Sequence, residues 1–272
     1  MSHVLHTSCA SGTGEKLFWL DVLPQTELGT VVDFGCGTGH VLKAAKGRKL
    51  KERSTIHDPV YIDHDEELIA EIERVGYNRT FVSSDPAFVS EVERSNRGPS
   101  VLLLSSVLHE IESHLTGGTT PMSASKPLFS AGFDYVVVRD FCRSLWAPQG
   151  LVAPRVLGTI FKRCADPYTA HSLSGGIYRG GVQGAPLDDY DVVEMALKSR
   201  WADGIDRGRE LSEHYFAVEH HALDAVAGQA GYHPVHVRRF KHPHVQAILN
   251  EMAITLDVPT HIEAVYKLRQ RP

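Results

Sequence analysis

Short apolar runs that alternate with helical patterns dominate the first half of this chain of 272 residues. Runs rich in Val, Leu, Ile and Tyr lie at residues 30–34, 59–63, 80–83, 100–105 and 134–139. Helical spacing of apolar residues follows the first three runs, at 39–45, 66–75 and 87–93. Unbroken apolar runs are typical of strands covered on both faces, and strands alternating with helices form right-handed βαβ units. The pattern predicts an α/β fold with a doubly wound, mostly parallel sheet.

The end of the chain follows a different pattern. Residues 234–240 and 261–268 largely alternate between apolar and polar side chains, as antiparallel edge strands do. Together with the five earlier runs they predict a seven-stranded sheet whose final strand is antiparallel.

A long insertion follows the fifth predicted strand. About ninety residues separate Arg139 from His233, where a compact α/β crossover needs a few tens. We interpret residues 145–230 as a helical and loop lid over the mouth of the sheet, inside a single domain of residues 1–272. The lid contains a Gly-, Ser- and Tyr-rich piece at 172–186 and a helical pattern at 187–198.

Composition narrows the class of protein. Lys and Arg number 28 against 33 Asp and Glu, a formal net charge of −5, so a nucleic-acid partner would need a local basic patch and is not expected. The four cysteines are widely spaced, which favours a reducing compartment over a disulfide framework. No signal-peptide pattern and no membrane-length apolar stretch occurs, so we expect a cytoplasmic protein without membrane contact. A homodimer stays an open alternative.

The most specific local motif is the glycine-rich turn after the first predicted strand, where Asp33 precedes Gly35, Gly37 and Gly39. Glycines remove the Cβ atoms that would keep a ligand away, and the following helix offers free N–H groups. A dinucleotide-binding fingerprint would need a third glycine where His40 stands. Asp33 would repel a diphosphate, but it would attract an ammonium or a sulfonium.

This turn resembles motif I of the class I S-adenosylmethionine-dependent methyltransferases, and the resemblance extends over roughly residues 30–140. It implies S-adenosylmethionine as cofactor, with Asp63, after the second strand, accepting hydrogen bonds from both ribose hydroxyls. It also implies that Asp85 faces the adenine amine. The cofactor-binding residues it implies are Asp33, Gly35, Cys36, Gly37, Gly39, Asp63, His64, Asp85, Pro86, Ser105 and Ser106. The alternative is that these glycines end a turn and the acids cap helices, as Asp65 would.

Candidate catalytic residues follow the fourth strand, at His109 and Glu110, and the fifth, at Arg139 and Asp140, because ligands of such sheets lie beyond the carboxyl ends of the strands. A methyl acceptor that must lose a proton needs a base, and His109, oriented by Asp140 or Glu110, is our candidate. In the alternative interpretation His109 packs or caps its helix, while Arg139 and Asp140 form a structural ion pair. Tyr215 faces the sulfonium or packs in the core beside Phe216, and Glu213 lies on the polar face of that predicted helix.

The leading functional prediction is a methyltransferase that acts on a small or medium-sized acceptor in a lidded pocket. One alternative is an enzyme of the same fold that uses the cofactor itself as substrate and releases methylthioadenosine by cyclisation or elimination. Another is a non-catalytic cofactor-binding subunit. We expect no metal site, because the histidines near the end of the chain are better placed for a surface, with Pro243 predicting a turn between His242 and His244.

Overall fold

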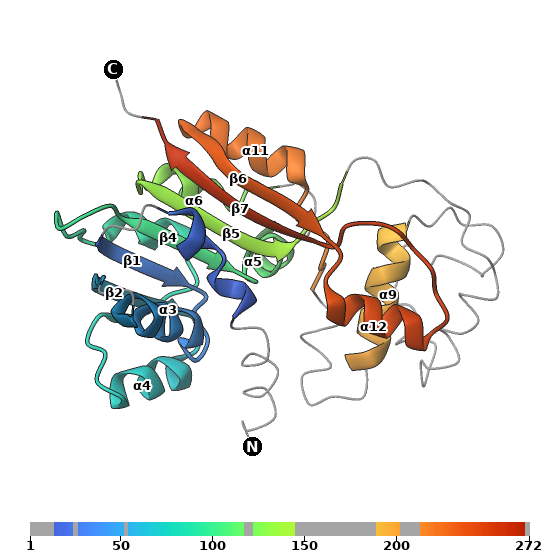
Figure 1. The fold of residues 1–272 in the computed structure, drawn as a ribbon, viewed down its shortest axis with the longest axis horizontal. Coiled ribbons are helices and arrows are strands. Elements are labelled where there is room, and N and C mark those ends of the chain that lie inside the picture. The colour runs from blue at the N-terminus through green and yellow to red at the C-terminus, as the bar shows by residue number, and fades with distance from the viewer. Residues whose placement is uncertain are drawn as a thin grey trace.

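The computed structural model of the protein describes residues 14–23, 27–51, 54–116, 122–144, 189–201 and 213–269. Their core is a seven-stranded sheet in the order β3-β2-β1-β4-β5-β7-β6 (Figure 1). The strands are β1 (Leu28–Phe34), β2 (Ile56–Asp63), β3 (Thr80–Val82), β4 (Val101–Ser105), β5 (Tyr135–Phe141), β6 (Tyr232–Phe240) and β7 (His261–Leu268). Neighbours from β3 to β5 pair in parallel, and β7 runs antiparallel to both β5 and β6. The predicted doubly wound sheet with a reversed final strand is confirmed.

Helices cover both faces of this sheet. Successive strand residues point to opposite sides, and the strands are apolar on both sides, so each face needs a cover. In β1, Val31 packs into one apolar cluster and Val32 into the other. The Val31 face is covered by η1 (Glu15–Leu17), α2 (Trp19–Val22), α3 (His40–Lys51) and α4 (Glu66–Arg74). The Val32 face is covered by η2 (Pro86–Glu91), α5 (Leu108–Thr116), α6 (Lys126–Ser130) and α11 (His220–Gln229). Burial on both faces explains the unbroken apolar runs in the sequence.

A third apolar cluster lies beyond the end of β6 and the start of β7, where α9 (Asp189–Trp201) packs beside α12 (Pro243–Glu251) (Figure 1). Tyr215 and Phe216 belong to this cluster, so the core interpretation holds for both residues. The helix predicted at 187–198 corresponds to α9. Most of the predicted lid, including residues 172–186, lies outside the described residues.

The prediction that residues 261–268 form an edge strand is wrong. β7 lies between β5 and β6, and the first six of its residues are buried. The edge strand is β6, on which Val235 and Val237 are exposed. The alternation of polar and apolar residues suggested one exposed face, but the polar residues His261 and Glu263 are buried.

Polar side chains begin several of the helices. The Asp65 carboxylate accepts hydrogen bonds from the amides of Glu67 and Leu68 at the start of α4, which confirms its capping role. The His242 ring accepts from the His244 amide, so the turn predicted around Pro243 is the beginning of α12. The helix predicted at 87–93 is instead the 3₁₀-helix η2. Within the described residues, no helix has the length and apolar character needed to cross a bilayer.

Candidate functional site

The glycine-rich turn follows β1 at the carboxyl edge of the parallel strands. Gly35 and Gly37 both have positive φ, 71° and 52°. A Cβ atom on Gly35 would overlap the side chain of Val107, whereas one on Gly37 would meet nothing within 4 Å. Gly35 therefore permits close packing inside the protein, while Gly37 leaves room for a ligand against the backbone.

Asp63, at the end of β2, holds this turn from the side. Its Oδ2 accepts a hydrogen bond from the Gly37 amide at 2.7 Å, and its Oδ1 accepts one from the Asp65 amide at 3.1 Å. The imidazole of His64 lies 3.2 Å from the same Oδ1, and 63% of the His64 side chain is exposed. A carboxylate offers about four acceptor positions, so buried Asp63 keeps capacity for the hydroxyls of a ligand lying along Gly37.

Two buried polar atoms at this edge have no hydrogen-bond partner within the described parts of the chain, Oδ2 of Asp33 and Oγ of Ser105. Burial, against the opposing charge of Lys16 and with help from nearby Asp63, raises the pKa of Asp33 to about 7. Buried polar atoms without partners are uncommon and call for a ligand or solvent partner. Both atoms fit a ligand that brings hydrogen-bond donors or positive charge.

The backbone at the end of β4 is strained. Ser106 has a φ of 60°, and its amide donates to the carbonyl oxygen of Arg139 at 2.7 Å. Non-glycine residues in this conformation persist where the surrounding structure holds them, often at binding sites.

The remaining cofactor residues that the resemblance implies have structural roles of their own. Asp85 is exposed and begins η2 by accepting from the Ala87 amide at 2.9 Å, and Pro86 is buried beside it. The Ser83 amide donates to the Asp63 carbonyl oxygen, which places the start of this segment at the same sheet edge. Burial raises the pKa of the Cys36 thiol, so Cys36 is inert at neutral pH.

His109 and Asp140 form a buried polar pair. Asp140, near the end of β5, accepts from the backbone amides of Leu108 and His109 at 2.7 and 3.3 Å. Its Oδ1 also lies 2.5 Å from His109 Nδ1. Asp140 rather than Glu110 therefore orients the imidazole, and Nε2 faces the other way. Burial alone would lower the pKa of His109, but Asp140, with Glu110 and Glu213, raises it to about 9.

Arg139 does not pair with Asp140, so the predicted structural ion pair is wrong. Adjacent residues of a strand point to opposite faces. The Arg139 guanidinium lies 3.1 Å from Glu15 and 3.9 Å from Glu263, whereas Asp140 faces His109. Burial lowers the pKa of Arg139, and the two glutamates partly offset this effect.

Aromatic rings surround the imidazole. Phe141 stacks on Tyr215 with ring centroids 4.9 Å apart, and His109 meets both rings edge-on at 5.3 and 5.8 Å. Glu213, just before Tyr215, places Oε2 3.9 Å from His109 Nε2. Sequence reasoning assigned Glu213 to a helix surface, and no local pattern connects it to His109.

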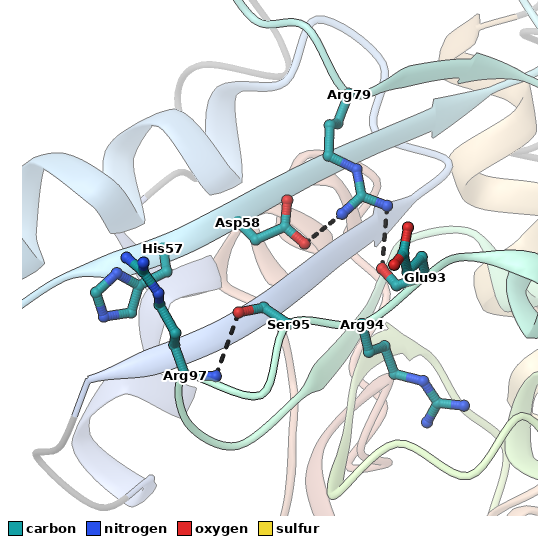
Figure 2. A pocket seen from close by; sticks show the side chains of 7 residues that line it. All are labelled: His57, Asp58, Arg79, Glu93, Arg94, Ser95 and Arg97. Atoms are coloured by element: carbon teal, nitrogen blue, oxygen red, sulfur yellow. Dashed lines mark hydrogen bonds and ion pairs between the residues drawn. The ribbon is translucent and has the colours of Figure 1, made fainter.

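A separate hollow of about 310 Å³ lies near the amino ends of the strands (Figure 2). His57 and Asp58, early in β2, line it together with Arg79 and the loop at 93–97. Arg79 is already bound there, at 2.5 Å from Asp58 and 3.0 Å from the Glu93 carbonyl oxygen. The hollow is remote from the carboxyl edge, where ligands of such sheets bind.

No model of a protein family matches the chain, and no curated protein matches its sequence. Among solved structures, the plantazolicin methyltransferase BamL, in complex with a desmethyl substrate analogue and SAH, is similar with a TM-score of 0.50 and 13% identity, over 96% of this chain and 86% of that one. An S-adenosylmethionine-dependent methyltransferase from Mesorhizobium loti is similar with a TM-score of 0.47 and 15% identity, over 94% of this chain and 100% of that one. Magnesium protoporphyrin IX methyltransferase from Synechocystis, with bound SAH, is similar with a TM-score of 0.44 and 11% identity, over 95% of this chain and 83% of that one. The likeness to BamL shows that the two chains share their fold.

Proposed function

We propose that this chain, which has the fold of the class I S-adenosylmethionine-dependent methyltransferases, binds S-adenosylmethionine and transfers its methyl group to a small or medium-sized acceptor. The observation that carries the proposal is the pairing of Gly37, open to a ligand, with the buried carboxylate of Asp63. Glycine backbone beside a carboxylate suits a ligand with a sugar diol and a positive charge.

The residues at the sheet edge fit this cofactor. Asp63 would accept from the ribose hydroxyls, and residues 85–86 would border the adenine. Asp33 and Ser105, whose buried oxygen atoms have no protein partner in the described residues, would face the methionine part with Ser106. When bound, the cofactor supplies a methyl group on a sulfonium, already activated for transfer. The protein's own contribution is then orientation and the exclusion of water.

The acceptor would lie on the side of α5, next to His109 and the partly exposed Glu110. An acceptor hydroxyl or amine must lose its proton at this place, and Nε2 of His109, on the side away from Asp140, would take it when the ring is neutral. Because the pKa of His109 is about 9, the neutral fraction and with it the transfer rate should rise as the pH approaches 9. Glu110 lies beside this atom, whereas Arg139 pairs with Glu15 of η1 and lies near Glu263 of β7. The lid predicted at residues 145–230 is part of the proposal as far as residue 219, since α11 covers a face of the sheet.

Calorimetric titration with SAH tests the cofactor assignment. Asp63→Ala should weaken binding by about 1–3 kcal/mol, or about 5- to 150-fold, because the ribose hydroxyls lose their acceptor. Asp65→Asn is the matched control, since Asn caps α4 as well as Asp does, and its affinity should stay near that of the wild type. Equal affinity in Asp63→Ala and wild type would remove the ribose assignment, and a wild type that does not bind SAH would overturn the proposed function.

Incubation with S-adenosylmethionine alone, followed by mass spectrometry, tests the reaction type. Methyl transfer to a separate acceptor predicts that the cofactor stays intact until an acceptor is added, and that SAH then appears. Formation of methylthioadenosine without an acceptor would contradict methyl transfer and establish that the chain consumes the cofactor itself.

A further inference from the structure

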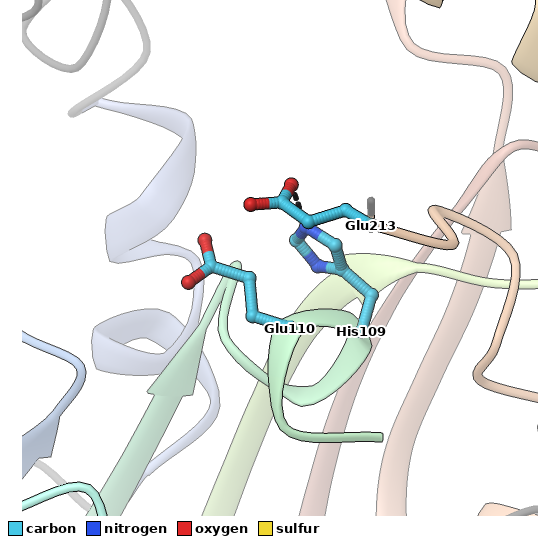
Figure 3. A group of neighbouring side chains, drawn as sticks. All are labelled: His109, Glu110 and Glu213. Carbon is cyan, nitrogen blue, oxygen red and sulfur yellow. Dashed lines mark ion pairs between the residues drawn. The ribbon is translucent and has the colours of Figure 1, made fainter. Parts of the chain in front are cut away.

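Three side chains that can bind a metal ion converge at the start of α5 (Figure 3). His109 and Glu110 are neighbours in the first turn of the helix, and Glu213 reaches them from the segment that leads to Tyr215. One donor atom from each lies within 4.8 Å of the other two. Donor atoms bonded to one cation at about 2.0–2.2 Å lie up to about 4.4 Å apart. Small movements of the two glutamate side chains would therefore complete a three-ligand set.

Asp140 supplies the outer shell that such a site needs. It holds Nδ1 of His109 at 2.5 Å and leaves Nε2 on the side of Glu213, 3.9 Å from its Oε2. Metal-binding histidines usually donate their other ring N–H to a carboxylate, which fixes both tautomer and ring orientation. Because Asp140 also accepts from two backbone amides of α5, the fold itself sets the direction of Nε2.

We propose that His109, Glu110 and Glu213 bind a divalent first-row metal ion on the acceptor side of the site. A ligand set of one imidazole nitrogen and two carboxylates suits Mn²⁺, Fe²⁺ or Zn²⁺ better than Mg²⁺ or Ca²⁺, which prefer oxygen alone. His109 and Glu213 are buried, and Glu110 is partly exposed, so the ion has rigid ligands and a route from solvent.

The role of the ion rests on the proposed function, whereas its binding does not. An acceptor hydroxyl bound to the ion loses its proton to water more readily, because the cation stabilises the oxyanion. The oxyanion then forms the new O–CH₃ bond as the S–CH₃ bond breaks, and SAH leaves. In this form of the site His109 is a ligand, and the ion replaces it as the group that activates the hydroxyl.

The test is a Mn²⁺ titration of the untagged, chelator-treated full chain, followed by the electron paramagnetic resonance signal of free Mn²⁺. We expect one tightly bound Mn²⁺ per chain. Glu110→Gln and Glu213→Gln should each weaken binding by about tenfold or more, since each loses a charged ligand, and Asp140→Asn should weaken it by about 10- to 100-fold. Glu71→Gln, exposed on α4, is the control and should bind as the wild type does.

Wild-type protein that binds no Mn²⁺ at millimolar concentration would overturn the proposal, as would equal affinity in wild type and the two glutamate variants. Thermal unfolding of each variant checks its fold, and the half-exposed Glu110 keeps the test informative if Glu213→Gln does not fold. SAH titration of the same samples separates the two proposals. Protein that binds SAH but not Mn²⁺ overturns the metal site alone, and protein that binds Mn²⁺ but not SAH overturns the proposed function.

Discussion

The glycines of the glycine-rich turn look alike in the sequence but have different surroundings in the structure. Gly35 faces the side chain of Val107 at close range, and Gly37 faces open space. Asp63 accepts from the amide of Gly37, so one residue closes the turn and also borders the ligand space. Gly35 therefore has a packing reason to lack a Cβ atom, and the role of both glycines in binding a ligand stays a prediction.

Two alanine substitutions separate these roles. Gly35→Ala should lower the free energy of unfolding by about 2–4 kcal/mol, because the methyl group overlaps Val107 at a positive φ. Gly37→Ala should cost only about 1–2 kcal/mol, from its positive φ, but should weaken SAH binding because the methyl occupies ligand space. Urea denaturation and calorimetry measure both quantities. Equal losses of stability, or unchanged SAH affinity in Gly37→Ala, would contradict this division.

Among the elements, the start of α5 depends on a residue of β5. Asp140 accepts from two amides of the first helical turn and from the His109 ring, so it replaces the local cap that the sequence does not supply. His109 does lie at its helix start, as the structural alternative held. It is, however, turned toward the site by a carboxylate from another strand.

Asp140→Asn tests this element-level link. The amide group cannot accept all of these hydrogen bonds and carries no charge, so the free energy of unfolding should fall by about 1–3 kcal/mol. Asp257→Asn, at a fully exposed side chain, is the control and should change stability by less than about 0.5 kcal/mol. Urea denaturation gives both values. A variant at position 140 as stable as the wild type would show that α5 begins without this carboxylate.

For the whole molecule, the buried carboxyl group of Asp33 links global stability to pH. Its pKa is about 7 in the fold and 3.8 as the ordinary value, so between these values the folded chain keeps a proton that the unfolded chain has lost. Stability from this group is present below about pH 4 and is lost as pH rises through 7. The structure therefore becomes less stable toward neutral pH as far as this residue is concerned.

Asp33→Asn removes that contribution. Between pH 5 and pH 8, the free energy of unfolding of the wild type should fall by about 1–3 kcal/mol more than that of the variant. Urea denaturation of both proteins at the two pH values measures the difference, and other titrating groups cancel in the comparison. The same change in both proteins would show that Asp33 is ionised in the fold at pH 5.

Much of the fold could be predicted because its cause is local in the chain. A strand covered on both faces needs an unbroken apolar run, and a backbone at positive φ needs residues such as Gly35 and Gly37. The strand ends and the acid at the end of β2 follow from the same patterns. The position of β7 inside the sheet could not be predicted, since His261 and Glu263 are polar and their burial depends on which strands lie beside them.

Local sequence accounts for the α/β class, the glycine-rich turn and the carboxylates at the strand ends, because burial and backbone conformation select residue types at neighbouring positions. The contact of Asp140 with His109, and the position of Glu213 near Glu110, depend instead on tertiary packing. These contacts join residues far apart in the chain, and strand order and packing bring them together. Strand propensity and helix periodicity contain no information on such pairs, so this group of polar side chains forms only when the sheet is assembled.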